Sequence, residues 1–114
     1  MSDAIRKEIR RVLGEWEATR LTAQGVQNWA KETSTRGADA YAAKVINHLR
    51  GLGEYLITVD DIPTYLEGLE LPPEMGVKHL ENEGANFDVK TRATDLKDDP
   101  FYGPHTKAIL RELT

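Results

Sequence analysis

The stretch that decides the fold is residues 38–53, ADAYAAKVINHLRGLG. Four of its apolar residues recur at i, i+4, i+8 and i+11, namely Tyr41, Val45, Leu49 and Leu52. This spacing is one stripe of an α-helix, and the alanines beside it let another helix approach closely. Gly51 and Gly53 suit the end of the helix, because glycine commonly follows the last helical turn. We therefore predict a helix over residues 38–52 with one face in the core.

Two helices are predicted before this stretch. The first covers residues 3–19 and has apolar residues at helical spacing: Ile5, Ile9, Val12, Leu13 and Trp16. The second covers residues 22–33, where the Thr22 hydroxyl can accept a free backbone N–H at the helix start. Each helix carries one tryptophan, and aromatic residues at helical spacing usually pack in the core. Arg6 and its basic neighbours lie off the apolar stripe, and we interpret this flank as solvated.

The segment after the central helix, residues 55–71, reads YLITVDDIPTYLEGLEL. Its first five residues are an apolar run rich in β-branched side chains, which fits a short buried strand or an extended connection. Helical spacing then returns over residues 61–70, at Ile62, Tyr65, Leu66 and Leu69. Asp60 and Asp61 stand at the start of this helix, and Pro63 falls in its first turn, where proline is accepted. We interpret the two aspartates mainly as helix caps, with one carboxylate left to face outward.

The last forty residues show weaker patterns. Residues 74–84 suit another short helix, and residues 104–113 suit a C-terminal helix that begins at a proline. Residues 87–93, FDVKTRA, alternate in polarity and could pair with residues 55–59 as a small two-stranded element. Residues 95–104 form a turn-rich loop by composition.

These patterns predict one mainly α domain over residues 1–114, a single-domain helical bundle of four to five helices. A chain of 114 residues is long enough to bury a core without covalent staples. The minor two-stranded β element stays open. The regular helices are expected at about 3–19, 22–33, 38–52, 61–70 and 104–113.

Composition excludes several classes of protein. Cysteine is absent, so disulfides, zinc–thiolate sites and thiol nucleophiles are excluded. No apolar run reaches 18 residues, so we expect no transmembrane helix. The first eleven residues, MSDAIRKEIRR, lack the apolar run of a secretory signal. We therefore expect a cytoplasmic protein with no membrane partner.

Motifs of catalysis are also missing from the sequence. It contains no nucleophile elbow, phosphate-binding loop, dinucleotide-binding fingerprint, zinc-protease motif or calcium-binding loop. His79, Glu81 and Glu83 would share a face only in a strand, and this segment looks helical or irregular, so we predict no metal site there. The pair Asp98–Asp99 precedes a proline and suits the start of a turn. We expect no cofactor and no enzyme activity.

The net charge of −4 is unevenly distributed. Residues 1–50 carry nine Lys/Arg against six Asp/Glu, whereas residues 51–114 carry six against thirteen. An acidic half repels nucleic-acid phosphates, so no nucleic-acid partner is expected, and it attracts a basic protein surface. Acids beside aromatic residues suit such an interface. The residues predicted to bind a protein partner are Asp60, Asp61, Tyr65, Glu67, Glu70, Asp98, Asp99 and Tyr102.

The function favoured by these features is a small non-catalytic protein-binding module that holds a basic partner through its acidic second half. One alternative is a structural or homo-oligomerisation domain whose helix faces complete a homodimer. Another is a small ligand-binding protein or an enzyme with a spatially assembled site. The reading in which the aromatics are core and the acids are an ordinary solvent coat also stays open.

The order of features over residues 9–69 resembles a known group of proteins. A helix ends at Trp16, the segment LTAQGVQNWA follows, and a third helix leads to Asp61-Ile62 and Tyr65-Leu66. This arrangement is similar to small all-helical bacterial proteins of the bacteriocin-immunity type and to related uncharacterised families. The resemblance implies a cytoplasmic, non-catalytic, acidic helical domain that binds and blocks a toxin.

Overall fold

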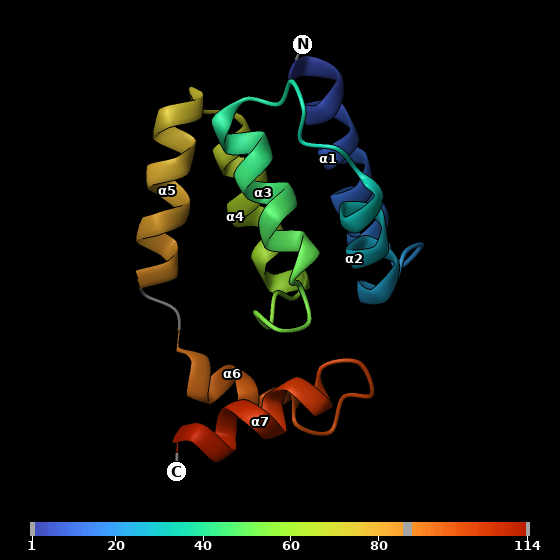
Figure 1. The fold of residues 1–114 in the computed structure, drawn as a ribbon, viewed down its shortest axis with the longest axis vertical. Helices are drawn as coiled ribbons and strands as arrows, with labels where there is room; N and C mark the ends of the chain where they lie inside the picture. Colours follow the sequence, from blue (N-terminus) through green and yellow to red (C-terminus); the bar gives the residue numbers. More distant parts are fainter. Residues whose placement is uncertain (1, 86–87, 114) are drawn as a thin grey trace.

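A computed structural model describes residues 2–85 and 88–113 of the chain (Figure 1). The prediction of a mainly helical fold is confirmed: the described residues form seven α-helices and one short 3₁₀ helix, and no β-strand. The helices, in chain order, are α1 (Ser2–Glu17), α2 (Ala23–Glu32), α3 (Ala40–Arg50), η1 (Val59–Asp61), α4 (Ile62–Leu69), α5 (Pro73–Ala85), α6 (Val89–Leu96) and α7 (Gly103–Leu113).

Helix α3 lies at the centre of the molecule and packs against α1, α2, α4 and α5. Its apolar stripe is fully buried, as its spacing predicts: Tyr41, Ala42, Val45, Ile46 and Leu49 all have no exposed surface. The Asp39 carboxylate caps the start of α3 by accepting the backbone N–H of Ala42. Trp16 is also buried, whereas Trp29 is only partly buried at the edge of the core. The core is therefore built around one helix that its neighbours enclose.

Close approach of α3, α4 and α5 depends on two glycines that face the ring of Tyr41. A Cβ atom at Gly68 would lie 2.1 Å from the Tyr41 hydroxyl, and one at Gly76 would lie 2.7 Å from the ring. The Tyr41 hydroxyl donates a 2.7 Å hydrogen bond to the backbone carbonyl of Tyr65 in α4. The buried phenol is thus both enclosed and hydrogen-bonded, as a polar group in a core must be.

Arg6 is not part of a solvated flank, because the structure turns it inward between α1, α3 and α4. Its guanidinium donates to both oxygens of Asp39, at 2.7 and 3.2 Å, and to the backbone carbonyl of Leu69 at 2.8 Å. It also lies 5.9 Å from the centre of the Tyr41 ring. The interpretation of this residue as solvent-facing was wrong. A side chain beside an apolar stripe is buried whenever two neighbouring helices close over it.

Helices α6 and α7 pack on each other and form a hairpin that lies across one end of the molecule (Figure 1). The hairpin contacts the turns of residues 51–58, which follow α3. The Tyr102 hydroxyl donates a hydrogen bond to the backbone carbonyl of Ile57, and Arg92 donates to the carbonyl of Leu56 at 3.2 Å. A Cβ atom at Gly53 would lie 3.0 Å from His105, so α7 approaches these turns closely.

Two parts of the predicted fold class need correction. The expected four to five helices are seven in the described residues, because α5 and α6 form where the sequence pattern is weak. The two-stranded β element is absent from the described residues: residues 51–56 form turns, and residues 89–91 begin α6. Phe87, which starts the alternating pattern, lies outside the described residues. The Asp88 carboxylate caps α6 by accepting the N–H of Thr91, which gives this segment a helical start.

Candidate functional site

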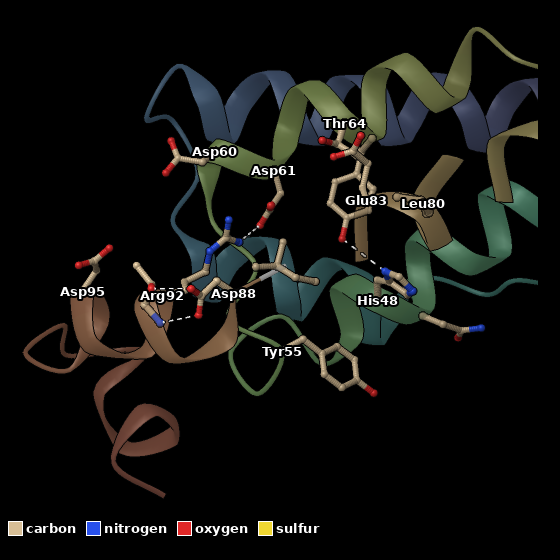
Figure 2. Close-up of a pocket in the computed structure, with 14 residues that line it drawn as sticks. His48, Tyr55, Asp60, Asp61, Thr64, Leu80, Glu83, Asp88, Arg92 and Asp95 are labelled. Atoms are coloured by element: carbon tan, nitrogen blue, oxygen red, sulfur yellow. Dashed lines mark hydrogen bonds and ion pairs between the residues drawn. The ribbon is translucent and has the colours of Figure 1, made fainter. Parts of the chain in front are cut away.

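A cleft of about 720 Å³ lies between α3 and α4 on one side and α6 on the other (Figure 2). Five of the side chains that line it are carboxylates, one is an arginine and one a histidine. The complete lining is Asn47, His48, Tyr55, Ile57, Asp60, Asp61, Thr64, Tyr65, Leu80, Glu83, Asp88, Thr91, Arg92 and Asp95.

The two adjacent aspartates are fixed by a capping box around the start of η1. The Thr58 hydroxyl accepts the N–H of Asp60, and the Asp61 carboxylate accepts the N–H of Thr58 at 2.9 Å. Asp61 therefore has a structural hydrogen bond and is only about one-quarter exposed. Asp60 is exposed and turns its carboxylate toward the rim of the cleft (Figure 2). The two neighbours thus have different surroundings.

Arg92 reaches across the cleft from α6 to Asp61 (Figure 2). Its guanidinium lies 2.5 Å from the Asp61 carboxylate and also donates to the Leu56 carbonyl. The side chains of Arg92 and Asp61 are 23% and 25% exposed, so water screens this ion pair only in part. The pair joins the two walls of the cleft.

The α6 wall of the cleft is one face of that helix. Asp88, Thr91, Arg92 and Asp95 are spaced at i, i+3, i+4 and i+7, and such residues lie together on a helix surface. The hydrogen bonds that Asp88 accepts from the backbone and hydroxyl of Thr91 hold the pKa of this carboxyl below its usual value. Asp88 is therefore ionised at neutral pH.

The opposite wall is aromatic. The Tyr65 ring is 4% exposed, and its hydroxyl lies 3.5 Å from Nδ1 of His48, at the outer limit of a hydrogen bond. The His48 ring also meets Tyr55 edge-on, with ring centres 6.4 Å apart. Burial, with a smaller contribution from Lys44, lowers the pKa of His48. The histidine is therefore neutral at pH 7 and adds no positive charge to the cleft.

The charge of this cleft suits the approach of a cation. Five carboxylates face one guanidinium that is already paired with one of them, so the cleft carries excess negative charge. A concave acidic surface with a low-dielectric wall concentrates the field that attracts a cation. The exposed ring of Tyr55, 57% accessible, offers a π face to an ammonium or guanidinium group. No group of three or more His, Asp or Glu side chains suited to a metal ion occurs among residues 2–85 and 88–113.

Three of the residues predicted to bind a partner lie together in the cleft: Asp60, Asp61 and Tyr65. Two others, Glu67 and Glu70, lie elsewhere on α4. The Glu67 carboxylate is 3.5 Å from His79 of α5, and the Glu70 carboxylate is 2.6 Å from Arg10 of α1. Glu70 therefore pairs with α1 and Glu67 lies against α5, both outside the cleft.

The remaining predicted residues belong to the connection between α6 and α7. Asp98 is exposed there, outside the cleft lining. The Asp99 carboxylate accepts the backbone N–H groups of Phe101 and Tyr102 and so stabilises the turn. Tyr102 is only 6% exposed and holds the hairpin against residues 51–58. The structure gives Asp99 and Tyr102 these structural contacts.

Five residues of the cleft that carry a charge or an imidazole are not among those predicted to bind a partner: Asp88, Arg92 and Asp95 of the α6 wall, and also His48 and Glu83. The signal for the α6 wall is present in the sequence, because Asp88, Arg92 and Asp95 share a face once residues 88–96 are taken as helical. His48 and Glu83 carry no comparable signal. They meet the cleft only because α3 and α5 bring distant parts of the chain together.

No protein-family model, curated protein or solved structure matches this chain. The resemblance to immunity-type proteins therefore stays a prediction. No helix among the described residues is long and apolar enough to span a bilayer.

Proposed function

We propose that this protein is a small non-catalytic protein-binding module that holds a basic partner in its acidic cleft. The observation that carries this proposal is the excess of negative charge in the cleft, five carboxylates against a single guanidinium. The partner would present a lysine- or arginine-containing segment. A cytoplasmic location belongs to the same proposal.

Electrostatic complementarity supports a basic partner. Charges arranged on one face raise the association rate of an oppositely charged protein, and the effect weakens with salt. Asp60, Asp88 and Asp95 are exposed and lie on both sides of the cleft, so their field points outward. An approaching cation would meet carboxylates from two directions.

The wall of the cleft supports retention of the partner after it arrives. Aromatic side chains in a recess are common anchors of protein interfaces, because they supply contact area at a low entropic cost. Tyr55 in the cleft is exposed, and so is Val59, which lies four residues further along the chain. These groups can pack against the aliphatic stem of a lysine or arginine.

Fluorescence anisotropy with labelled hexalysine tests the proposal, and hexaglutamate serves as the negative control. We expect micromolar binding of hexalysine at 50 mM salt, weakened about fivefold or more at 300 mM. The triple variant Asp60→Asn/Asp88→Asn/Asp95→Asn should abolish most of this binding. Asparagine is also a good helix cap, so the Asp88→Asn change should keep α6 folded.

A matched control separates the cleft from the overall charge of the chain. The variant Glu17→Gln/Glu32→Gln/Glu74→Gln removes the same number of charges from exposed positions outside the cleft. It should bind hexalysine almost as well as the wild type. Equal losses in the two triple variants would show that only net charge matters and would reject the cleft as the binding site.

The narrower prediction, an immunity-like inhibitor that blocks a toxin, rests on the resemblance alone. A toxin gene beside the gene for this chain, and co-purification of the two products, would support it. The homodimer alternative predicts twice the chain mass in light scattering at micromolar concentration.

A further inference from the structure

Arg92 shows how the cleft binds a guanidinium group. One of its nitrogens, Nη1, donates both to a carboxylate oxygen of Asp61 and to the backbone carbonyl of Leu56, at 2.5 and 3.2 Å. Both acceptors belong to a different part of the chain, 31 and 36 residues away. The cleft is therefore occupied by a basic side chain that arrives from the opposite wall.

The position of Asp61 is fixed independently of Arg92. Its carboxylate accepts the N–H of Thr58 in the capping box, and the Leu56 backbone is held within tight turns that follow α3. Acceptors that are already positioned bind an incoming group without an ordering cost. Removing Arg92 should leave these acceptors in place.

The carboxylates around this contact exceed what Arg92 neutralises. Asp60, Asp88 and Asp95 line the same cleft and are exposed. A partner that carries several cations can satisfy them together with Asp61, whereas Arg92 supplies one charge. Exchange of the internal arginine for an external one is therefore favoured by the additional contacts the partner makes.

We propose that the Asp61 carboxylate and the Leu56 carbonyl form a guanidinium-binding subsite, which Arg92 fills in the free protein and a partner arginine fills in the complex. This inference rests on the proposed function and names the side chain that the partner inserts. Arginine is preferred over lysine because the group that occupies the subsite is a guanidinium, and its planar Nη1 amino group directs two N–H donors in fixed directions toward the two acceptors. Arg92 acts as an intramolecular competitor.

Peptide binding tests the competition. Arg92→Gln empties the subsite, and Lys90→Gln removes the same charge from an exposed position of α6 outside the cleft. If the subsite is open about one-tenth of the time in the wild type, Arg92→Gln should bind labelled hexaarginine about tenfold more tightly than Lys90→Gln does. Hexalysine should bind the two variants with similar affinity.

Chemical rescue tests the subsite without any peptide. Arg92→Ala leaves a space for a small guanidinium compound beside Asp61. For a dissociation constant of about 5 mM, 50 mM methylguanidinium chloride should raise the Tm of Arg92→Ala by about 6 °C. The same concentration of methylammonium chloride should have a much smaller effect, and neither salt should raise the Tm of the wild type.

The outcomes separate the inference from the proposed function. If methylguanidinium does not stabilise Arg92→Ala more than methylammonium does, the subsite is overturned, even where hexalysine binds the wild type. If methylguanidinium stabilises Arg92→Ala but Arg92→Gln binds hexaarginine no more tightly than Lys90→Gln does, the displacement of Arg92 by a partner arginine is overturned. If methylguanidinium stabilises Arg92→Ala but the wild type binds neither hexalysine nor hexaarginine, the subsite is upheld and the protein-binding function is rejected. Arg92→Lys, which keeps the charge and loses the planar N–H donors, should behave like Arg92→Ala in the rescue experiment.

Discussion

Gly68→Ala should destabilise the protein, although alanine favours a helix. The added Cβ would lie 2.1 Å from the Tyr41 hydroxyl oxygen and 2.3 Å from the Cζ atom, far inside van der Waals contact. Tyr41 has no exposed surface, and Gly76 of α5 also lies against its ring, where an added Cβ would be 2.7 Å from a ring carbon. The ring therefore cannot move aside without separating α3 from α4 or α5.

The expected loss follows from two opposing effects. Overpacking a core costs about 1–3 kcal/mol, and an overlap above 1 Å belongs in the upper part of that range. Replacing a helical glycine with alanine returns about 1 kcal/mol of helix propensity. The net destabilisation is then about 2 kcal/mol, or a fall of about 1 M in the urea midpoint for a chain of this size.

Urea denaturation followed by circular dichroism at 222 nm measures this change, and Gly14→Ala is the matched control. Gly14 is an exposed position in α1 where an added Cβ meets no atom within 4 Å. It should gain about 1 kcal/mol from helix propensity alone. A Gly68→Ala variant as stable as Gly14→Ala would refute the close packing of Tyr41. In Gly68→Ala/Tyr41→Phe the loss should be smaller than the sum of the two single losses.

Three further predictions concern charge and titration. Arg6→Ala should lower the unfolding free energy measured in urea by about 3 kcal/mol, because it leaves the mostly buried Asp39 without its guanidinium. The control Arg10→Ala, at an exposed ion pair with Glu70, should lower it by under about 1 kcal/mol. Similar losses in the two variants would contradict the burial of Arg6. Burial lowers the pKa of His48 in the folded chain below its reference value of 6.5, so the contribution of this residue to stability is complete above pH 6.5 and is lost as the pH falls through the folded-state pKa. His48→Gln should therefore flatten the profile of unfolding free energy between pH 7.5 and 5. An unchanged slope would argue against this burial. Burial also raises the pKa values of Tyr41, Tyr65 and Tyr102 above their reference value of 10. In the variant Tyr55→Phe, which keeps only these three tyrosines, the tyrosinate absorbance at 295 nm should rise with increasing pH only when the helices unfold. A rise at a lower pH than unfolding would show that the phenols are accessible.

The sequence predicts the helices that have a clear apolar stripe, including the eight-residue α4, and it fails where that stripe is missing. The central helix is recognisable because its four-residue spacing is kept over three turns and its face is buried on all sides. Helix α6 has eight residues and one fully buried side chain, Ala93, so it leaves almost no apolar pattern. Its identity as a helix is decided by the cap at Asp88 and by packing against α7.

The candidate site could be predicted only in part for a related reason. Asp60 and Asp61 are visible in the sequence as adjacent acids before a helix, and both lie in the cleft. Their different surroundings are not visible, because the partner of Asp61 is Arg92, 31 residues further along the chain. Glu70 illustrates the opposite error: its charge fits the acidic half, yet it pairs with Arg10 from the first helix. Pairings between distant segments depend on helix packing that local patterns do not encode.

The attachment of the α6–α7 hairpin has a consequence for how the chain tolerates mutation. Two of its hydrogen bonds end on the backbone carbonyls of Leu56 and Ile57, and every residue type carries a carbonyl. Substitutions at these two positions would keep both acceptors, provided the turns retain their shape. Arg92 and Tyr102 supply the donors through their side chains, so substitution of either residue would remove its hydrogen bond. For these two hydrogen bonds, side-chain identity matters on the donor side, whereas the acceptor side depends on the backbone shape of residues 56 and 57.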